Sequence, residues 1–500
     1  MVNMVSVPHL GAAGGLAIDF SIMVEKVPAP QVQRKAVAFP QCQDAAAELF
    51  EMLAEPRTGS PAAFLDSSDH GSSGQLGGPA PQRRRYSILA FSQGPHTEAV
   101  HLGEGAFGWL QRHWPHRGTP TGGAGETSTA QGPPFQLGWV GWIGYEEQAQ
   151  LFRATHAVVV DHHHASAQIQ TLGQDSIWVG EVETAIAQLF SGAQQGDKQV
   201  MPEGADSVWL EKLKVRDQEA EYLQKIRAAQ AQIREGNSYE ICLTTAVEGT
   251  FHGSPLSAYR RLREANRAPF TQYFNFPATE DSAATVLLST SPERFVSIDA
   301  EGMIRSEPIK GTRPRGKTPQ EDAAQIRDLE THPKDRAENV MIADLVRNDL
   351  SIHAETGSLR TERLCAVETY PSVHQMVSTV SARLSAEASR ARALSDAFPP
   401  GSMTGAPKIS TMNILSELET GPRGPYSGVA GYFSTTGACD LSVLIRTAAL
   451  TSPGGGGEWD FHLGLGGAIT ADSDPAAEWA EVITKSRGVL SALDTRFPGG

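Results

Sequence analysis

The sequence predicts an α+β protein built on large, mostly antiparallel sheets. Segments with strand character and segments with helical periodicity are both frequent, but they do not alternate regularly, which argues against a Rossmann or TIM-barrel arrangement. Turn residues join neighbouring strand segments at Asp299-Ala300-Glu301-Gly302 and at Gly454-Gly455-Gly456-Gly457, as in the hairpins of an antiparallel sheet. No internal repeat is evident.

Composition and charge restrict the partners of the chain. Of the 500 residues, 40% are hydrophobic and 20% are charged, as in a soluble globular protein with one large domain or two to three ordinary ones. The formal net charge of −15 and a pI near 5.5 argue against nucleic acids and anionic membranes as partners. An anionic substrate would therefore need a local basic pocket.

The cysteines and the apolar segments bear on the compartment. Cys42, Cys242, Cys365 and Cys439 lie far apart and form no CxxC pair, so no zinc or redox motif is visible, and reduced, buried thiols are expected. No apolar run is long enough to span a membrane. The first thirty residues lack the basic start and apolar core of a secretory signal. We expect a cytoplasmic enzyme.

The N-terminal part divides into an extension and a first structured region. Residues 1–34 contain Gly and Pro without a clear period, and we expect this extension to be partly disordered. Residues 35–208 form the N-terminal region, which ends in a polar, Gly-containing linker at 192–207. Its expected elements are a helix at 43–54, strands at 63–65 and 85–90, and a Gly- and Trp-rich strand pair at 135–145.

The C-terminal part, residues 209–498, has clearer periodicity. Tyr222, Ile226, Ala229 and Ile233 repeat at helical spacing, and Gly236 follows as a C-cap. The next expected elements are a strand at 238–251, the hairpin at 285–310, helical structure over 319–353, a strand at 374–384, helices at 388–398 and 407–419, strands at 425–435, 440–450 and 459–468, and a helix at 475–493.

Two ionisable residues of the hairpin at 285–310 could carry chemistry. Glu293 follows a Ser-Pro step at the start of one strand, and Lys310 lies between Ile309 and Gly311 at the end of the next. The hairpin would bring both to the same end, where a carboxylic acid and an amine can act as acid and nucleophile. The alternative is a surface hairpin with two solvated charges.

Three glutamates could hold a hard cation. Glu478 and Glu481 share a face of the last helix because they are three residues apart, and the helical stretch at 319–353 carries Glu338. Mg²⁺ takes oxygen ligands and keeps several waters, so it needs few protein groups. A Glu-x-x-Glu pair is also typical of a solvated helix face, and this alternative stays open.

Cationic and glycine-rich positions near the C-terminus could bind an anion. Arg446 lies within an apolar strand, where it would either pair with an acid such as Asp440 or hold a substrate carboxylate. Lys485 lies one helical turn after Glu481, so its alternative is a surface ion pair. The backbone of Gly464–Ala468 exposes N–H donors at a strand end, a feature that is also common in plain turns.

Several of these residues lie in spaced motifs between Gly236 and the C-terminus. The motifs are Ser291-Pro292-Glu293-Arg294-Phe295, Pro308-Ile309-Lys310-Gly311-Thr312, Ala337-Glu338-Asn339 through Arg347-Asn348-Asp349, Gly401-Ser402-Met403-Thr404-Gly405-Ala406-Pro407-Lys408, Tyr426-Ser427-Gly428, and Asp474-Pro475 followed by Glu478 and Glu481. A weaker likeness covers Phe64-Leu65-Asp66-Ser67 and Gly138 to Tyr145. Together they resemble the chorismate-utilising enzymes, the family of anthranilate synthase component I, aminodeoxychorismate synthase component I, and the isochorismate and salicylate synthases.

The resemblance implies a fold and a reaction. The fold is a β-sandwich of large antiparallel sheets with helices outside, as in anthranilate synthase component I. At position 310 the chain resembles the aminodeoxychorismate branch, which has lysine there, whereas the other branches typically have alanine. The resemblance implies that the amine of Lys310 attacks C2 of chorismate and that ammonia then adds at C4. Glu293 matches the general acid that protonates the departing 4-hydroxyl. A neutral amine is needed, so we expect the site to depress the pKa of Lys310.

The resemblance also implies a cofactor and a substrate pocket. Glu338, Glu478 and Glu481 match a Mg²⁺ cluster that would hold a carboxylate of chorismate and orient its ring. Relatives bind tryptophan in the N-terminal region, and whether Asp66-Ser67-Ser68 does so here is open. The positions that match the surroundings of the substrate carboxylates are Ser402, Thr404, Tyr426, Arg446, Gly466, Gly467 and Lys485.

Two departures from the family pattern separate its branches. Members that add water carry a base lysine where this chain has Glu240, so activation of water by lysine is not expected. Anthranilate and salicylate synthases place a histidine where this chain has Gln375, and His374 faces the other side of that strand. The alternatives are an anthranilate synthase component I that carries lysine, and a non-catalytic chorismate-binding homologue, which would have broken site positions.

The source of ammonia follows from a missing motif. No Gly-x-Cys-x-Gly stretch with downstream His and Glu is present. A separate glutamine amidotransferase subunit that supplies ammonia is therefore implied.

Overall fold

The computed structural model describes residues 31–42, 44–68, 85–115, 133–195, 207–371, 373–452 and 457–499. The residues from Val32 onward form one compact unit. Most of the predicted extension at 1–34, most of the linker at 192–207 and most of the glycine turn at 454–457 lie outside the described residues. Strand β1 (Val32–Ala38) already begins inside the predicted extension, and helix α3 (Ser176–Gln195) continues into the predicted linker.

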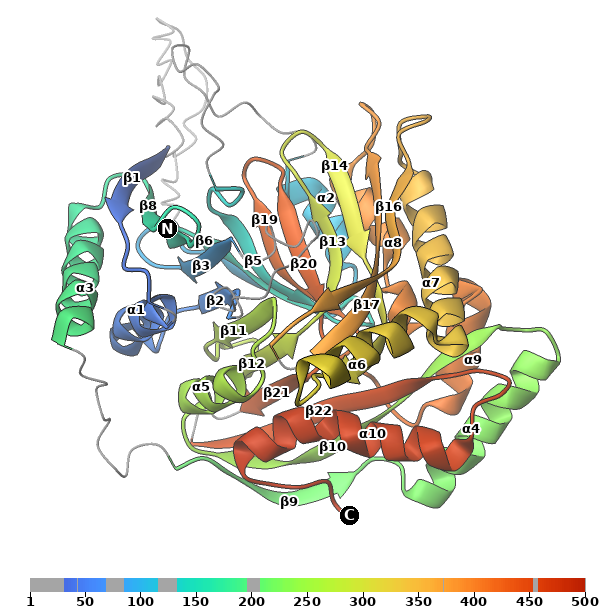
Figure 1. Cartoon of the computed structure of the whole chain (residues 1–500). Coiled ribbons are helices and arrows are strands. Elements are labelled where there is room, and N and C mark those ends of the chain that lie inside the picture. The colour runs from blue at the N-terminus through green and yellow to red at the C-terminus, as the bar shows by residue number, and fades with distance from the viewer. Residues whose placement is uncertain are drawn as a thin grey trace, which may run out of the picture. The chain divides into compact units, whose positions relative to one another are not determined.

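The described strands form two antiparallel sheets (Figure 1). The first sheet has twelve strands, in the order β1, β8 (Ser166–Leu172), β7 (His156–Asp161), β3 (Tyr86–Phe91), β2 (Ala62–Asp66), β11 (Phe270–Phe276), β12 (Ala284–Ser291), β21 (Thr447–Ser452), β22 (Glu458–Ile469), β10 (Glu240–His252) and β18 (Gly405–Ala406), with β9 (Trp209–Val215) also on β10. The second has ten, in the order β15 (Ile309–Pro314), β17 (Val373–Arg383), β14 (Met303–Glu307), β13 (Arg294–Ile298), β20 (Cys439–Val443), β19 (Val429–Ser434), β5 (Gly138–Ile143), β6 (Ala149–Ala154) and β4 (Ala99–Leu102), with β16 (Arg360–Thr369) also on β17.

Alternating side chains place each sheet between two apolar layers. In β2, Phe64 packs with helices on the outer face of the first sheet, while Ala63 and Leu65 pack in a cluster shared with the second sheet. In β19, Ala430 and Tyr432 join that shared cluster from the opposite side. Two sheets that bury a common core with helices outside form a β-sandwich, so the predicted fold class is confirmed.

Ten α-helices among the described residues cover the outer faces of the sheets (Figure 1). The predicted helical stretch at 319–353 is two helices, because Pro333 begins the second one and His332 caps it. The helices are α1 (Ala45–Ala54), α2 (Ala106–His113), α3, α4 (Glu219–Arg234), α5 (Pro255–Ala265), α6 (Pro319–Thr331), α7 (Pro333–Ser351), α8 (Arg390–Ala397), α9 (Lys408–Leu418) and α10 (Pro475–Leu490).

The chain passes between the sheets several times, and two of these crossovers, from β12 to β13 and from β20 to β21, are adjacent. Their backbones are joined by hydrogen bonds: the N–H of Thr290 donates to the carbonyl of Arg446 at 3.1 Å, and the N–H of Val443 donates to the carbonyl of Glu293 at 3.0 Å. The prediction of one strand over 440–450 is wrong, because this segment forms β20 and β21 in different sheets. Arg446 has a positive φ of 50° in the connection.

The predicted strand pair at 135–145 is also wrong, because it is the single strand β5, which pairs with β6 and β19. Its glycines permit close approach of the neighbouring strands. A Cβ on Gly141 would lie 2.1 Å from the carbonyl oxygen of Gln150. The glycines of this segment therefore mark a single strand with close neighbours on both sides, and not the turn of a strand pair.

The cysteines agree in part with the expectation of buried, reduced thiols. All four are free; Cys42 is exposed, and Cys242, Cys365 and Cys439 are buried. Within the described part of the chain, no helix is both long enough and apolar enough to cross a bilayer.

Candidate active site

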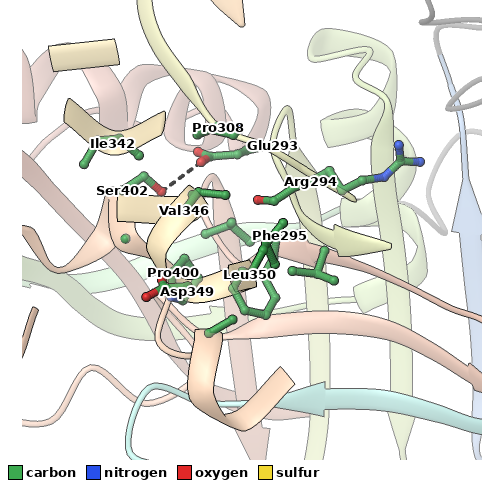
Figure 2. Close-up of a pocket in the computed structure, with 15 residues that line it drawn as sticks. Glu293, Arg294, Phe295, Pro308, Ile342, Val346, Asp349, Leu350, Pro400 and Ser402 are labelled. Atoms are coloured by element: carbon green, nitrogen blue, oxygen red, sulfur yellow. Dashed lines mark hydrogen bonds between the residues drawn. The ribbon is translucent and has the colours of Figure 1, made fainter. Parts of the chain in front are cut away.

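Glu293 is a buried carboxylic acid at the first crossover. Its side chain is 5% exposed, and the hydroxyl of Ser402 donates a hydrogen bond to its Oε1 at 2.8 Å (Figure 2). Burial raises the pKa of Glu293 to about 7, although the Ser402 hydrogen bond and the charge of Lys310 act in the opposite direction. Glu293 therefore holds a proton in mildly acidic solution and can donate it, as a general acid does.

A small cavity adjoins the Glu293–Ser402 pair. It has a volume of about 20 Å³, enough for about one water molecule, and Figure 2 draws the residues that line it. Ile342, Val346 and Leu350 of α7 line the cavity. It is too small for an organic substrate, but its apolar wall leaves the carboxyl of Glu293 poorly solvated, which is the cause of the raised pKa.

Lys310 lies on β15 as a buried cation. Its side chain is 12% exposed, and its Nζ donates a hydrogen bond to Oε1 of Glu240 at 2.7 Å; Glu240, at the start of β10, is fully buried. Gly311, with a φ of 84°, bends the strand directly after the lysine. A Cβ at Gly311 would lie 2.9 Å from Leu329 of α6, so this bend requires glycine.

The expectation of a depressed lysine pKa is wrong. Burial alone would lower the pKa of Lys310, but the carboxylates of Glu240 and Glu338 outweigh it and raise this pKa above its usual value. The resting Lys310 is therefore an ammonium. The sequence showed Glu240 only as a replacement for lysine, because 70 residues separate it from Lys310 and no local pattern joins β10 to β15.

Two of the three predicted metal ligands lie around a lysine. Nζ of Lys334 is 3.8 Å from Oε1 of Glu338 and 3.6 Å from Oε1 of Glu478, which also accepts a hydrogen bond from Ser473 at 2.6 Å. Among the described residues, Oε1 of Glu338 is buried without a hydrogen-bond partner, and burial raises the pKa of Glu338 to about 7. Sequence reasoning missed Lys334, although its i,i+4 spacing to Glu338 is a visible signal.

The third predicted ligand, Glu481, is paired differently. It forms an ion pair with Lys485 at 2.8 Å, and Lys485 also donates to the carbonyl of Gly466 at 2.8 Å. The predicted alternative of an i,i+4 ion pair is therefore confirmed. In the described ranges no group of three or more His, Cys, Asp or Glu side chains is close enough to hold a metal ion. The three glutamates are near one region but are not assembled as a cluster.

Gly467 keeps space open between these groups. A Cβ at this position would lie 3.3 Å from Oε2 of Glu478 and 4.0 Å from Nζ of Lys485. Gly464, on the same strand β22, instead receives the ring of Tyr426, because a Cβ there would lie 2.1 Å from that ring. On β22, Gly464 thus makes room for the ring of Tyr426, and Gly467 leaves the carboxylate of Glu478 accessible.

Thr404 faces its own loop. It is fully buried, and its hydroxyl lies 3.4 Å from the carbonyl of Gly401 and 3.5 Å from that of Pro400. Its backbone carbonyl accepts a hydrogen bond from the N–H of Cys242 at 2.9 Å. Thr404 therefore fixes the loop that carries Ser402 onto β10.

Arg446 has no ion-pair partner in the described part of the chain, and burial lowers its pKa. Asp440, one of its two predicted partners, pairs instead with Arg294 through two hydrogen bonds of 2.8 Å. The pairing of Arg446 with Asp440 is therefore wrong. Arg446 is half-buried, and a ligand carboxylate is its remaining predicted partner.

His374 is engaged away from Lys310. Its Nε2 lies 2.9 Å from Oδ1 of Asp322 on α6, and its Nδ1 lies 2.9 Å from the hydroxyl of Thr369 on β16. The neighbouring Gln375 lies opposite Thr312 of β15 in the sheet register. The structure thus places the histidine against α6.

Taken together, the site combines an acid with a pKa of about 7, an ammonium held by a carboxylate, and three further glutamates in the same region. Lys310 is at its centre, because its charge acts on Glu293, Glu338 and Glu481. These residues come from a crossover, two strands and two helices that are distant in sequence. The arrangement suits displacement at carbon by an amine with acid assistance to the leaving group.

A family model described as chorismate binding enzyme matches residues 93–491. This span includes strands of both sheets and every candidate residue described above.

Individual relatives agree with that match. The chain is 45% identical over 385 residues to an aminodeoxychorismate synthase of Streptomyces griseus, covering 73% of this chain and 51% of that protein. It is 44% identical over 277 residues to aminodeoxychorismate synthase component 1 of Klebsiella aerogenes, covering 55% of this chain and 58% of the relative. The chain thus spans about half the length of the curated relatives it matches.

The fold is also found among solved structures. Anthranilate synthase component I from Streptococcus pneumoniae TIGR4 superimposes with a TM-score of 0.63 at 24% identity, covering 84% of this chain and 94% of that one. Motifs, fold and site therefore lead to one assignment: the chain belongs to the chorismate binding enzyme family.

Proposed function

We propose that this chain is an aminodeoxychorismate synthase component I, a transferase that converts chorismate and ammonia into 4-amino-4-deoxychorismate for 4-aminobenzoate and folate synthesis. The observation that carries the proposal is Lys310, a buried lysine beside a protonated acid where other branches of the family typically have alanine. The names of the relatives at 45% and 44% identity support the same choice.

Glu293 and Lys310 would act at the two ends of one displacement. The amine of Lys310 attacks C2 of chorismate, both ring double bonds shift by one position, and the C4–O bond breaks. Glu293 gives its proton to the departing hydroxyl, which leaves as water. Ammonia then adds at C4 and expels the amine of Lys310 from C2. Glu293, now a carboxylate, takes the proton that the added ammonia must lose.

The substrate carboxylates need cations in a protein whose formal net charge is −15. Arg446 would supply a guanidinium that has no ion pair among the described residues, and Lys485 a second cation. Lys485 donates a hydrogen bond to the carbonyl of Gly466 on β22, and a Cβ at Gly467 would lie 4.0 Å from its Nζ. We assign this region to the substrate carboxylates, with Tyr426 packed against Gly464 of the same strand and Thr404 fixing the Ser402 loop onto β10.

Mg²⁺ is the proposed cofactor, held by Glu338, Glu478 and Glu481. The buried oxygen of Glu338, which accepts no hydrogen bond among the described residues, and the open space at Gly467 support the fit. Lys334 and Lys485 would release their carboxylates as the ion binds, because they occupy the same oxygens. When bound, the ion would supply positive charge that holds a substrate carboxylate and orients the ring.

A separate glutamine amidotransferase subunit would supply the ammonia, in keeping with the name component 1 of the Klebsiella relative. The four free cysteines support a reducing cytoplasm as the location. Tryptophan at Asp66-Ser67-Ser68 is not part of the proposal. The carboxylate of Asp66 there accepts hydrogen bonds from Arg263 at 2.8 Å and from Ser87 at 2.7 Å.

Lys310→Ala tests the proposal. With chorismate, Mg²⁺ and ammonium, the wild type should form aminodeoxychorismate, measured by liquid chromatography and mass spectrometry. Because the nucleophile is missing, Lys310→Ala should lower kcat by about 10³-fold or more. The control is Lys317→Ala, which removes an exposed lysine nearby and should leave kcat unchanged. Unaltered turnover in Lys310→Ala would show that the covalent role is wrong.

The same assay separates the alternatives. Anthranilate and pyruvate formed without an added lyase would identify an anthranilate synthase component I. Chorismate binding without any turnover would identify a non-catalytic homologue. In both cases the proposed reaction would be rejected.

A further inference from the structure

Glu240 has no role in the reaction as described so far, yet its place in the fold is closely defined. It is the first residue of β10, where it pairs with Ala406 of β18. Ile241 and Leu243 turn to the helix-covered face of the first sheet, whereas Cys242 packs with residues of the second sheet and α7. Because side chains alternate along a strand, Glu240 points the same way as Cys242, toward β15.

The contacts of Glu240 are incomplete for a structural ion pair. Its Oε1 accepts the hydrogen bond from Lys310 at 2.7 Å, but its Oε2 is buried without a partner among the described residues. Asp440 shows the contrast, because Arg294 donates to both of its oxygens at 2.8 Å. A buried carboxylate oxygen that is left open costs free energy, and such costs are commonly retained where they serve a function.

The proposed reaction needs a proton acceptor at this place. The ammonium of Lys310 has no lone pair, so one proton must leave before the nitrogen can bond to C2. Besides the Cys242 thiol, four carboxyl groups act on Lys310: Glu240, Glu293, Glu338 and Glu481.

Three of these four carboxyl groups have other tasks. Glu293 must keep its proton for the leaving group, Glu338 lies beside Lys334, and Glu481 is paired with Lys485. Glu240 is the group that accepts a hydrogen bond from Nζ of Lys310 in the described structure.

We propose that Glu240 is the catalytic base that takes a proton from Lys310, an inference that rests on the proposed function. When chorismate binds, one proton moves from Nζ to Oε1 along the existing hydrogen bond and leaves a neutral amine and a neutral carboxylic acid. The lone pair of Nζ then forms the bond to C2 as the C4–O bond breaks. When ammonia expels the amine, Glu240 returns the proton and the pair regains its resting state.

Glu240→Gln is the first test, because the amide keeps the shape and an acceptor oxygen but cannot take the proton. Ammonia-dependent kcat should fall by about 10²-fold or more, while KM for chorismate changes by less than about threefold. Glu240→Asp keeps a carboxylate and should recover part of the loss. Turnover of Glu240→Gln within about twofold of the wild type would overturn the proposal.

A second measurement distinguishes a Glu240 that acts as a base from a Glu240 that only stabilises the positive charge of Lys310. Glu240 raises the pKa of Lys310, so Glu240→Gln should let acetic anhydride modify Lys310 at a lower pH than in the wild type, as followed by peptide mass spectrometry. If Glu240 only stabilises the charge of Lys310, the Glu240→Gln variant, whose Lys310 has a lower pKa, should keep or gain turnover. If Glu240 is the base, the variant should lose turnover although the pKa of its Lys310 is lower.

Chemical rescue gives a matched pair. Glu240→Ala leaves a buried space beside Lys310, so added formate should restore turnover in a saturable way. Formate should not help Glu240→Gln, because the amide fills the same space. Rescue of both variants, or of neither, contradicts a base at this position. If the wild type itself forms no aminodeoxychorismate, the proposed function fails, whereas an active wild type with an equally active Glu240→Gln rejects only the role of Glu240.

Discussion

At the scale of single residues, a carboxyl can serve as an acid near neutral pH only where its surroundings favour the protonated form. Burial provides this at Glu293 and raises its pKa to about 7. The Ser402 hydroxyl works against burial, because it donates its hydrogen bond to the ionised carboxylate. Activity that depends on protonated Glu293 should therefore decline as the pH rises through about 7.

Ser402→Ala should move this decline to higher pH. Removing the donor destabilises the ionised form of Glu293, so its pKa rises by about one unit, equivalent to ~1.4 kcal/mol. The measurement is the basic limb of the pH profile of kcat/KM for chorismate. Ser402→Thr keeps the hydroxyl and should keep the wild-type limb. If the basic limb of Ser402→Ala stays in place or moves to lower pH, the Ser402 hydrogen bond does not lower the pKa of Glu293.

Arg294, which is buried, and Arg446, which is half-buried, should respond differently to substitution by glutamine. Arg294→Gln removes the guanidinium that pairs with Glu307 and Asp440 and should destabilise the fold by about 3 kcal/mol, measured by urea unfolding. Arg446→Gln removes a cation without an ion pair among the described residues, so stability should hold while KM for chorismate rises by about 10²-fold. Loss of stability in Arg446→Gln without a change in KM would argue for a structural role.

At the scale of elements, β22 offers a matched pair of glycines. Gly464→Ala forces a Cβ against the ring of Tyr426 at 2.1 Å and should destabilise the fold by about 1–3 kcal/mol. Gly467→Ala places its Cβ 3.3 Å from Oε2 of Glu478, so it should fold normally but lose turnover and Mg²⁺ response. Melting temperature and kcat measured on both variants check this. Equal effects of the two substitutions on stability would contradict a packing role for Gly464 and a site role for Gly467.

The elements also show what local patterns can predict. The turn at Asp299 to Gly302 correctly predicted the pairing of β13 with β14, and helical spacing predicted α4. Both depend on interactions between near neighbours in sequence. The break between β20 and β21 was missed, because Leu444 to Thr447 contains no glycine, proline or other turn residue and the change of sheet is a tertiary event.

The candidate site shows the same division. The resemblance selected Glu293, Lys310 and the three glutamates as candidates, but the ion pair of Lys310 with Glu240 reverses the expected shift of the pKa of Lys310. That reversal depends on a contact between β10 and β15 across two sheets. Composition and spacing carry no information on such a contact, so the electrostatics of the site required the structure.

At the scale of the whole molecule, two buried acids tie stability to pH. Glu293 and Glu338 each have a pKa of about 7 in the folded protein, above the 4.5 of an ordinary glutamate. Both prefer the protonated form in the fold, so their contribution to stability is fully present below pH 4.5 and is lost as the pH rises through about 7. The size is at most roughly 3 kcal/mol for each group.

Mg²⁺ should reverse part of this loss, because it would bind the ionised form of Glu338. We expect added Mg²⁺ to raise the melting temperature of the wild type more at pH 8 than at pH 6, as measured by calorimetry without substrate. Glu478→Gln should abolish the increase, whereas Glu417→Gln, an exposed site on α9, should retain it. An equal increase at both pH values, or an increase that survives in Glu478→Gln, would place the ion elsewhere. Because this readout needs no turnover, it tests the metal site independently of the reaction.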